Sequence, residues 1–309
     1  MISTPTWSLA QLRALKLDTT AILCTPSVRP LIKDLFSFPL IDSLANLPGG
    51  LENLIVVGGG SLIDEAKLFR VKERPALSLI AIASIWGSGA EVSPIAIERT
   101  VPKKQFRIDP KLLPDARLII SELAASIPPM RAKHACGDVW AHAVEGFLSP
   151  LGSDTLKKEM AAVIAEMTKA TSFQTAQWFE WGAKACAGQA ASSVGLVHGM
   201  AHVLESVLAT ERPDLKATHA RLCATLLYPV MKFNRSASAT FQKLMETHGI
   251  DAATVLEIAK DLYEPEFFEA ILSTITNRWM DILRDPCSRT NCALVRPGDV
   301  AFFEGKKFL

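Results

Sequence analysis

The chain changes character at Pro128-Pro129, and this break constrains its fold more than any other feature. Before the break, apolar runs rich in β-formers alternate with segments of helical spacing, and we expect strands at 20–25, 54–57, 77–82, 95–98 and 116–120. After it, nearly every segment has helical spacing, at 130–148, 155–171, 180–208, 219–233, 238–248, 252–261 and 265–283. Strands that alternate with helices indicate a mostly parallel α/β sheet. The sequence therefore predicts an α/β domain over residues 1–127 and an all-helical domain over residues 128–309.

Composition supports this division and excludes several classes of partner. A chain of 309 residues is long enough for two domains, and its net charge of +1 does not suggest a nucleic-acid-binding surface. The six cysteines include no CxxC pair, so they predict neither a disulfide framework nor a zinc finger. We find no secretory signal and no run of apolar residues long enough to span a membrane. We therefore expect a soluble, cytoplasmic protein that binds neither nucleic acid nor membrane.

Two glycine-bearing turns follow predicted strands of the α/β domain. In IVVGGGSLIDEAK, residues 55–67, a strand runs into Gly58, Gly59, Gly60 and Ser61, and a helix follows. The unpaired amides at the start of that helix favour an anion such as a pyrophosphate, although a tight connection without a ligand has about even odds. The spacing does not match the GxGxxG fingerprint. The second turn, 84–91, should lie at the same carboxyl edge of the sheet, which strengthens the nucleotide interpretation.

Histidines recur at helical spacing in the predicted all-helical domain. Asp138 and His142 are four residues apart, as are His198 and His202, and His219 opens a further helix. Residues four apart share a helix face, so each pair can offer ligands in one direction. A structural pair is the alternative interpretation, and it is favoured for Asp138 and His142 taken alone. An aspartate and several imidazoles from three helices would suit zinc or iron.

These segments together resemble the iron-containing, metal-dependent alcohol dehydrogenases. The resemblance rests on seven motifs in family order: GGGSLIDEAK at 58–67, WGSGAEVSPIAI at 86–97, LLPDARLI at 112–119, GDVWAHAVEGFLS at 137–149, GLVHGMAH at 195–202, THARLCATLLYPVMKFN at 218–234 and DPCSRTN at 285–291. It implies a Rossmann-like, dehydroquinate-synthase-like first domain and a helical catalytic domain. It also implies a divalent metal (Fe²⁺ or Zn²⁺), NAD or NADP, a small alcohol or aldehyde substrate, and a homo-oligomer, usually a dimer.

The resemblance assigns roles to individual residues by their place in the motifs. The metal ligands would be Asp138, His142, His198 and His219, and His202 would lie beside the substrate and nicotinamide as a catalytic proton relay. The cofactor would be bound by Gly58, Gly59, Gly60, Ser61, Asp64, Ser84, Gly87, Ser88 and Lys104.

The chain departs from the family pattern in its cofactor half. Where the family has Thr-Thr-x-Gly-Thr-Gly-Ser-Glu, this chain has SIWGSGAE at 84–91, and Ile85 replaces a cofactor-facing hydroxyl. Several tens of residues are missing between Thr25 and Leu54, where the family holds the adenosine end of the cofactor. The choice between NAD and NADP is therefore open, and we expect weaker cofactor binding.

Two alternatives to a dehydrogenase remain. A sugar-phosphate cyclase shares the fold, NAD and a metal, but it uses a different ligand pattern. A family member that has lost turnover would explain the shortened adenosine region, but its four metal-ligand positions are intact.

Overall fold

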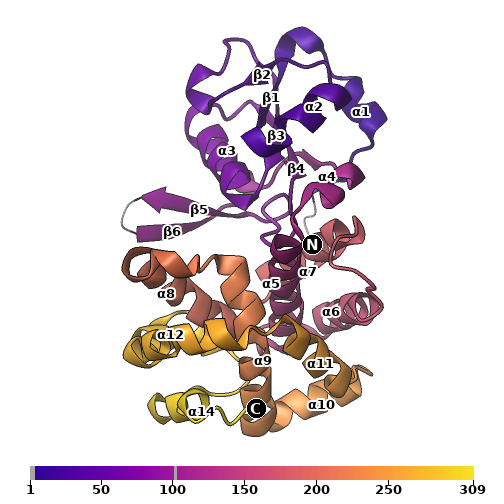
Figure 1. Ribbon diagram of the computed structural model, residues 1–309. Coiled ribbons are helices and arrows are strands. Elements are labelled where there is room, and N and C mark those ends of the chain that lie inside the picture. Colours follow the sequence, from indigo (N-terminus) through magenta and orange to yellow (C-terminus); the bar gives the residue numbers. More distant parts are fainter. Residues whose placement is uncertain (1–3, 101–102) are drawn as a thin grey trace. The chain divides into compact units, whose positions relative to one another are not determined.

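A computed structural model describes residues 4–100 and 103–309 of the chain, except for the side chains of residues 99–104 (Figure 1). The chain forms two compact units. The first contains residues up to 127 together with 174–183, and the second contains residues 128–173 and 184–309. A single break at residue 127 did not anticipate the return of 174–183 to the first unit.

A parallel sheet forms the core of the first unit, as predicted. Its strand order is β2-β1-β3-β4-β7 and every pairing is parallel. The strands are β1 (Thr20–Cys24), β2 (Leu40–Ile41), β3 (Asn53–Gly58), β4 (Ser78–Ala83) and β7 (Ala116–Arg117). The central strands are nearly continuous apolar runs because both faces of the sheet are covered. Gly58 pairs with Ala83 at the ends of β3 and β4, so the turns that follow these strands leave the same edge.

The helices of the first unit are short except for the one that follows the triple glycine. They are α1 (Leu9–Arg13), α2 (Arg29–Leu35), α3 (Gly60–Glu73) and α4 (Ser121–Ser126). Between β1 and β3 the chain forms only the seven-residue α2 and the two-residue β2. The structure thus places very little regular structure in the region that the sequence showed to be shortened.

An antiparallel hairpin lies outside the main sheet. The predicted strand at 95–98 is β5 (Ile95–Thr100), which pairs with β6 (Lys103–Ile108) instead of joining the parallel strands. We did not predict β6, because its run of charged residues, KKQFR at 103–107, lacks the apolar signal of a buried strand.

The second unit is helical, as predicted. Its helices are α5 (Pro129–Leu148), α6 (Asp154–Met167), α8 (Leu196–Glu211), α9 (His219–Ala237), α10 (Ala239–Thr247), α11 (Ala252–Leu262), α12 (Pro265–Asn277), α13 (Trp279–Arg284) and α14 (Val300–Glu304). Helix α7 (Gln177–Ala190) begins in the first unit and ends in the second. None of the helices in the described residues is long and apolar enough to cross a membrane.

The predicted helix at 180–208 was wrong, because the structure forms two helices there, α7 and α8. The break falls before Gly195, the N-cap of α8, whose φ and ψ of −133° and −145° are not helical. A side chain at this position would clash, since an added Cβ would lie 2.8 Å from Glu145 Oε1 and 2.9 Å from Asn291 Oδ1. The predicted helix at 265–283 is likewise divided, into α12 and α13.

Helix α5 is buried along most of its length and packs closely against α9. Gly137 makes this approach possible, because an added Cβ would lie 2.5 Å from the Cα atom of Ala224. The close packing brings the motif GDVWAHAVE on α5 next to the first turns of α9.

Candidate functional site

The four predicted metal ligands meet around one carboxylate oxygen in the second unit. Asp138 Oδ1 lies 3.7 Å from His142 Nδ1 on the same helix, α5. It lies 3.6 Å from His198 Nε2 on α8 and 3.8 Å from His219 Nε2 on α9. Three helices therefore contribute to one cluster, which we call the Asp138 site.

Several polar atoms of the Asp138 site are buried without a hydrogen bond. Within the described part of the chain, Asp138 Oδ1, His142 Nδ1 and His198 Nε2 have no hydrogen-bond partner. The whole Asp138 residue is only 3% exposed and His198 only 2%. Unsatisfied buried polar atoms cost free energy, so this cluster is a candidate site for a ligand. An oxygen and several imidazole nitrogens at these separations fit a divalent transition metal.

The charge state of Asp138 is suited to a cation. Burial raises the pKa of its carboxyl, but the imidazoles of His142, His198 and His219 outweigh burial and lower that pKa overall. Burial lowers the pKa of His142 to about 3, with Asp138 opposing the shift. An ionised carboxylate and a neutral imidazole are the forms that bind a metal.

The pKa values of the imidazoles on α8 and α9 are raised, in contrast to the lowered pKa of His142. Burial lowers the pKa of His219, but Cys223 and Glu205 outweigh burial and raise it to about 10. The pKa of His198 is also raised, because Cys223, Asp138 and Glu145 outweigh its burial. A cation that enters the site must displace these protons, so we expect metal binding to strengthen as the pH rises.

Glu145 fixes the orientation of His198, a role that the sequence analysis missed. Its Oε2 lies 2.7 Å from His198 Nδ1, and its Oε1 accepts the backbone N–H of Val197 at 2.6 Å. A carboxylate that holds one ring nitrogen directs the other nitrogen toward the metal. The signal was available, because Asp138, His142 and Glu145 are spaced i, i+4 and i+7 on one face of α5.

Cys223 was also missed. The donor atoms of Asp138, His198, His219 and Cys223 all lie within 4.8 Å of one another, whereas His142 is outside this group. The Cys223 Sγ lies 3.6 Å from His219 Nε2. The four-residue spacing from His219 to Cys223 could have indicated this contact, since it equals that of the other pairs.

His202 lies beside the Asp138 site, with its own partners. Its ring stacks on that of His219, with centroids 5.6 Å apart and an interplanar angle of 18°. His202 Nδ1 lies 3.4 Å from Asp285 Oδ2 and 3.9 Å from Cys287 Sγ, both from the DPCSRTN motif. Burial lowers the pKa of His202, and the neighbouring imidazoles lower it further against the effect of Asp285. These effects favour the neutral form of the ring.

The two glycine turns of the first unit are in contact with each other. Gly59 is the N-cap of α3, so the amides of Gly60 and Ser61 belong to a first helical turn that lacks preceding carbonyls. An added Cβ on Gly60 would lie 2.4 Å from Ser88 Oγ, and the N–H of Ser84 donates to Gly58 O at 2.9 Å. The predicted cofactor residues of both turns are therefore close together.

The second turn depends on glycine for its backbone. Gly87 has a φ of +117° and Gly89 a φ of +56°, in the region that favours glycine. The side chain of Trp86 in this turn is 3% exposed and packs edge-to-face on Phe179, with ring centroids 5.2 Å apart.

Two predicted cofactor residues are placed differently from the others. Asp64 is buried, with Oδ1 3.1 Å from Lys67 Nζ and Oδ2 accepting the N–H of Ile97 at 3.1 Å. Its carboxylate thereby ties α3 to β5. Lys104 is in β6, and its side chain is outside the described residues.

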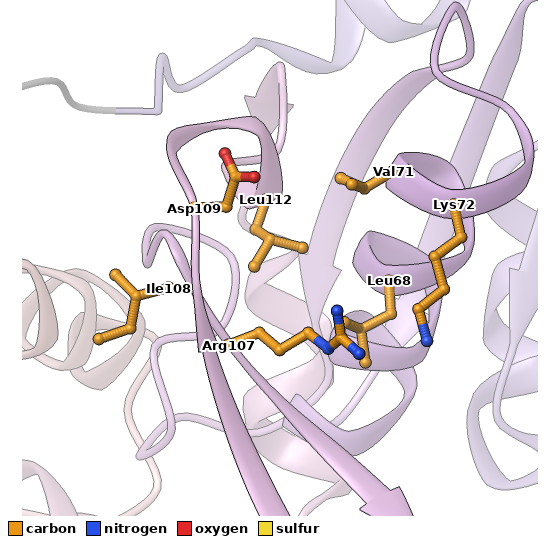
Figure 2. Close-up of a pocket in the computed structure, with 7 residues that line it drawn as sticks. All are labelled: Leu68, Val71, Lys72, Arg107, Ile108, Asp109 and Leu112. Carbon is orange, nitrogen blue, oxygen red and sulfur yellow. The ribbon is translucent and has the colours of Figure 1, made fainter.

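A separate pocket of about 240 Å³ lies at the other end of α3 (Figure 2). None of the predicted site residues lines it, and its walls are formed by Leu68, Val71, Lys72, Arg107, Ile108, Asp109 and Leu112. Figure 2 shows Lys72 and Arg107 reaching toward the same part of the pocket. Both cations are paired with the single carboxylate of Glu98, at 2.5 and 2.6 Å, so the three side chains together carry one net positive charge.

Sequence comparisons show which curated proteins the chain is similar to. It is 28% identical to the probable alcohol dehydrogenase EutG of Escherichia coli, over 60% of this chain and 52% of that protein. It is 27% identical to the 1-propanol dehydrogenase PduQ of Salmonella typhimurium, over 67% of this chain and 59% of that protein. The chain thus spans about half the length of the curated relatives it matches. No family model matches it.

Solved structures show the same fold. An iron-containing alcohol dehydrogenase from Thermococcus thioreducens matches with a TM-score of 0.75 at 21% identity, covering 99% of this chain and 97% of that one. A maleylacetate reductase from Agrobacterium tumefaciens matches with a TM-score of 0.77 at 16% identity, covering 99% and 96%. These findings confirm the predicted fold class and the resemblance to the iron-containing alcohol dehydrogenases.

Proposed function

From this likeness in sequence and fold to the iron-containing alcohol dehydrogenases, we propose that the chain is a metal-dependent, NAD(P)-linked oxidoreductase. It interconverts an alcohol and an aldehyde or ketone by hydride transfer. The observation that carries the proposal is the set of unpaired buried donor atoms around Asp138 Oδ1, because these atoms fit a cation and nothing else in the described chain satisfies them.

The proposed metal, Fe²⁺ or Zn²⁺, is held by Asp138, His142, His198 and His219. A bound metal supplies Lewis-acid chemistry, which polarises a substrate oxygen. Glu145 keeps His198 in the orientation and tautomer that a metal ligand needs, through its 2.7 Å contact with Nδ1.

His202 is the proposed proton carrier. A bound nicotinamide cofactor would supply hydride chemistry, and His202 would take up the proton released on oxidation of the alcohol and pass it to solvent. Asp285, 3.4 Å from His202 Nδ1, is placed to accept that N–H, and an imidazole held in this way takes up a proton at Nε2.

The proposed cofactor site uses the two glycine turns. Gly58, Gly59, Gly60 and Ser61 bind the pyrophosphate through the first-turn amides of α3, while Ser84, Gly87 and Ser88 face the nicotinamide. The family motif also assigns Asp64 and Lys104 to this site, although Asp64 has its contacts within the unit.

The test combines metal analysis with a substrate panel. Purified protein is assayed for Fe and Zn and for oxidation of alcohols and reduction of aldehydes with NAD(H) and NADP(H). We expect about one metal per chain in the wild type, and loss of both metal and activity in Asp138→Ala and His198→Ala. The matched control is Asp299→Ala, a change of the same chemistry in the same unit. Full activity and metal content in Asp138→Ala would refute the site.

Cofactor binding is tested separately by fluorescence titration. Gly60→Ala should weaken binding, because its Cβ would displace Ser88, whereas Gly49→Ala should not, since nothing lies within 4 Å of the added atom. Net accumulation of NADH or NADPH from an alcohol distinguishes a dehydrogenase from a cyclase that recycles its NAD. Absence of binding at millimolar cofactor would instead indicate a protein that has lost turnover.

We also infer from the family resemblance that the protein is a cytoplasmic homodimer. Light scattering of the purified protein tests the oligomeric state, and a monomer would refute it.

A further inference from the structure

We propose that Cys223 is a ligand of the metal, and that its sulfur gives the centre a preference for Zn²⁺ over Fe²⁺. The inference rests on the metal centre of the proposed function. It adds one donor to that centre, a cysteine that lies outside any CxxC pair but within the motif THARLCATLLYPVMKFN at 218–234.

Geometry places the sulfur among the other donors. Cys223 is fully buried in α9, one helical turn after His219, and its Sγ lies 3.6 Å from His219 Nε2. With Asp138 and His198 it belongs to the only group in the described residues that combines one carboxylate, two imidazoles and one thiol within 4.8 Å. His142 is not in that group, although its Nδ1 is 3.7 Å from Asp138 Oδ1.

Two of these donor atoms are both buried and unpaired, which points to a common ligand. Asp138 Oδ1 and His198 Nε2 are buried and have no hydrogen-bond partner in the described chain. Their residues are only 3% and 2% exposed, so water does not reach them freely. The thiol sulfur thus lies within 4.8 Å of two buried donor atoms that have no hydrogen-bond partner in the described chain.

The chemistry of the donor set indicates the metal. Thiolate is a soft ligand that zinc accepts readily, and zinc sites combine cysteine, histidine and carboxylate ligands. The thiol releases its proton to solvent when the metal binds, and the resulting thiolate and the Asp138 carboxylate together neutralise a divalent cation. A centre of oxygen and nitrogen donors alone has a smaller preference for Zn²⁺ over Fe²⁺.

The direct test needs no variant. Zinc-loaded wild-type protein is examined by X-ray absorption, where one sulfur scatterer at about 2.3 Å is expected beside nitrogen and oxygen at about 2.0–2.2 Å. Zinc without a sulfur neighbour would overturn the assignment. Cobalt-loaded protein provides a second signature, a thiolate-to-metal charge-transfer band in the near ultraviolet.

Variants test whether Cys223 is the source of the charge-transfer band. Cys223→Ser should abolish the charge-transfer band and weaken Zn²⁺ binding about tenfold or more, while its affinity for Fe²⁺ changes less. Cys186→Ser is the control, because Cys186 is likewise a buried helical cysteine of the second unit. A band that persists in Cys223→Ser, or equal losses of Zn²⁺ and Fe²⁺ affinity, would refute the inference.

The outcome is separable from that of the proposed function. If Asp138→Ala loses metal and activity but the wild type shows no sulfur scatterer, the dehydrogenase proposal stands and the role of Cys223 falls. If a sulfur scatterer is present but no alcohol or aldehyde is turned over, the reverse holds.

Discussion

Replacing Glu145 by glutamine should separate the folding of the second unit from its capacity to bind metal. The carboxylate accepts from two sides, at 2.6 Å from the Val197 N–H and 2.7 Å from His198 Nδ1. Glutamine has the same shape but only one acceptor oxygen, so it can satisfy only one of these donors. If its oxygen stays with Val197, its amide N–H faces His198 and forces the proton of that ring onto Nε2. His198 then presents an N–H to the metal instead of a lone pair.

The loss of metal affinity and the loss of folding stability are expected to differ in size. A ligand whose outer partner is lost typically binds its metal 10- to 100-fold more weakly, or about 1.4–2.8 kcal/mol. Glu145→Ala removes the two short hydrogen bonds, from the Val197 N–H and the His198 ring, and a longer one from the His198 N–H at 3.4 Å. The two short bonds are each worth about 1.5–3 kcal/mol, so the change should cost about 3–6 kcal/mol of unfolding free energy. Glu145→Gln should lose less stability, because one of the two bonds survives.

Competition with a chelator measures metal affinity, and urea unfolding of the metal-free protein measures stability. The control is Glu166→Gln, whose exposed carboxylate lies 3.5 Å from Lys184 Nζ and far in sequence from the Asp138 site. Wild-type metal affinity in Glu145→Gln would show that His198 does not depend on this carboxylate, and the reasoning would be wrong.

Three further changes probe the packing, the charges and the metal of the second unit. Gly199→Ala should lose about 1–3 kcal/mol in urea unfolding, because its Cβ would lie 2.0 Å from Ser288 Oγ, whereas Gly298→Ala, with open space around it, should change stability by less than about 0.5 kcal/mol. Burial raises the pKa of Glu264, but His134 and Arg221 outweigh it and lower that pKa from 4.5 to about 2. The stabilisation of the fold by the Glu264 carboxylate is therefore complete above pH 4.5 and is lost as the pH falls toward 2. Glu264→Gln should remove this pH dependence of stability together with about 2 kcal/mol of unfolding free energy at neutral pH. Equal unfolding curves of the two proteins at pH 6 would contradict this. Removing the metal with a chelator should lower the unfolding free energy by about 2.7 kcal/mol relative to protein held at a hundredfold excess of metal over its Kd, and an unchanged melting temperature would argue against a metal in the folded state.

The first unit shows how far apolar pattern alone can predict a fold. The central strands were predictable because each is a continuous apolar run followed by a turn, and a run of that kind requires burial on both faces. The hairpin of β5 and β6 was not, since β6 is a charged segment that forms a strand only through its pairing with β5. Residues 174–183 joined the first unit through contacts such as the 2.6 Å ion pair of Arg117 with Glu180, a partner 63 residues away.

In the helical unit, too, some features could be predicted from the sequence and others could not. The sequence showed that Asp138 shares a helix face with His142, and His198 with His202, because the helical period fixes this from spacing alone. It could not show the break before Gly195, since the reason for that break is the approach of Glu145 and Asn291 from other parts of the chain.

The sequence by itself determined the type of each domain, the turns that precede helices, and the kinds of ligand that each helix can offer. Only the tertiary structure decided which helix faces meet, and therefore that Glu145 holds His198 and that Cys223 lies beside His219. The physical reason is that periodicity is local, whereas the meeting of faces depends on close packing between distant segments, such as Gly137 of α5 against Ala224 of α9. The candidate metal centre exists because three amphipathic helices pack with their polar atoms turned toward one buried carboxylate.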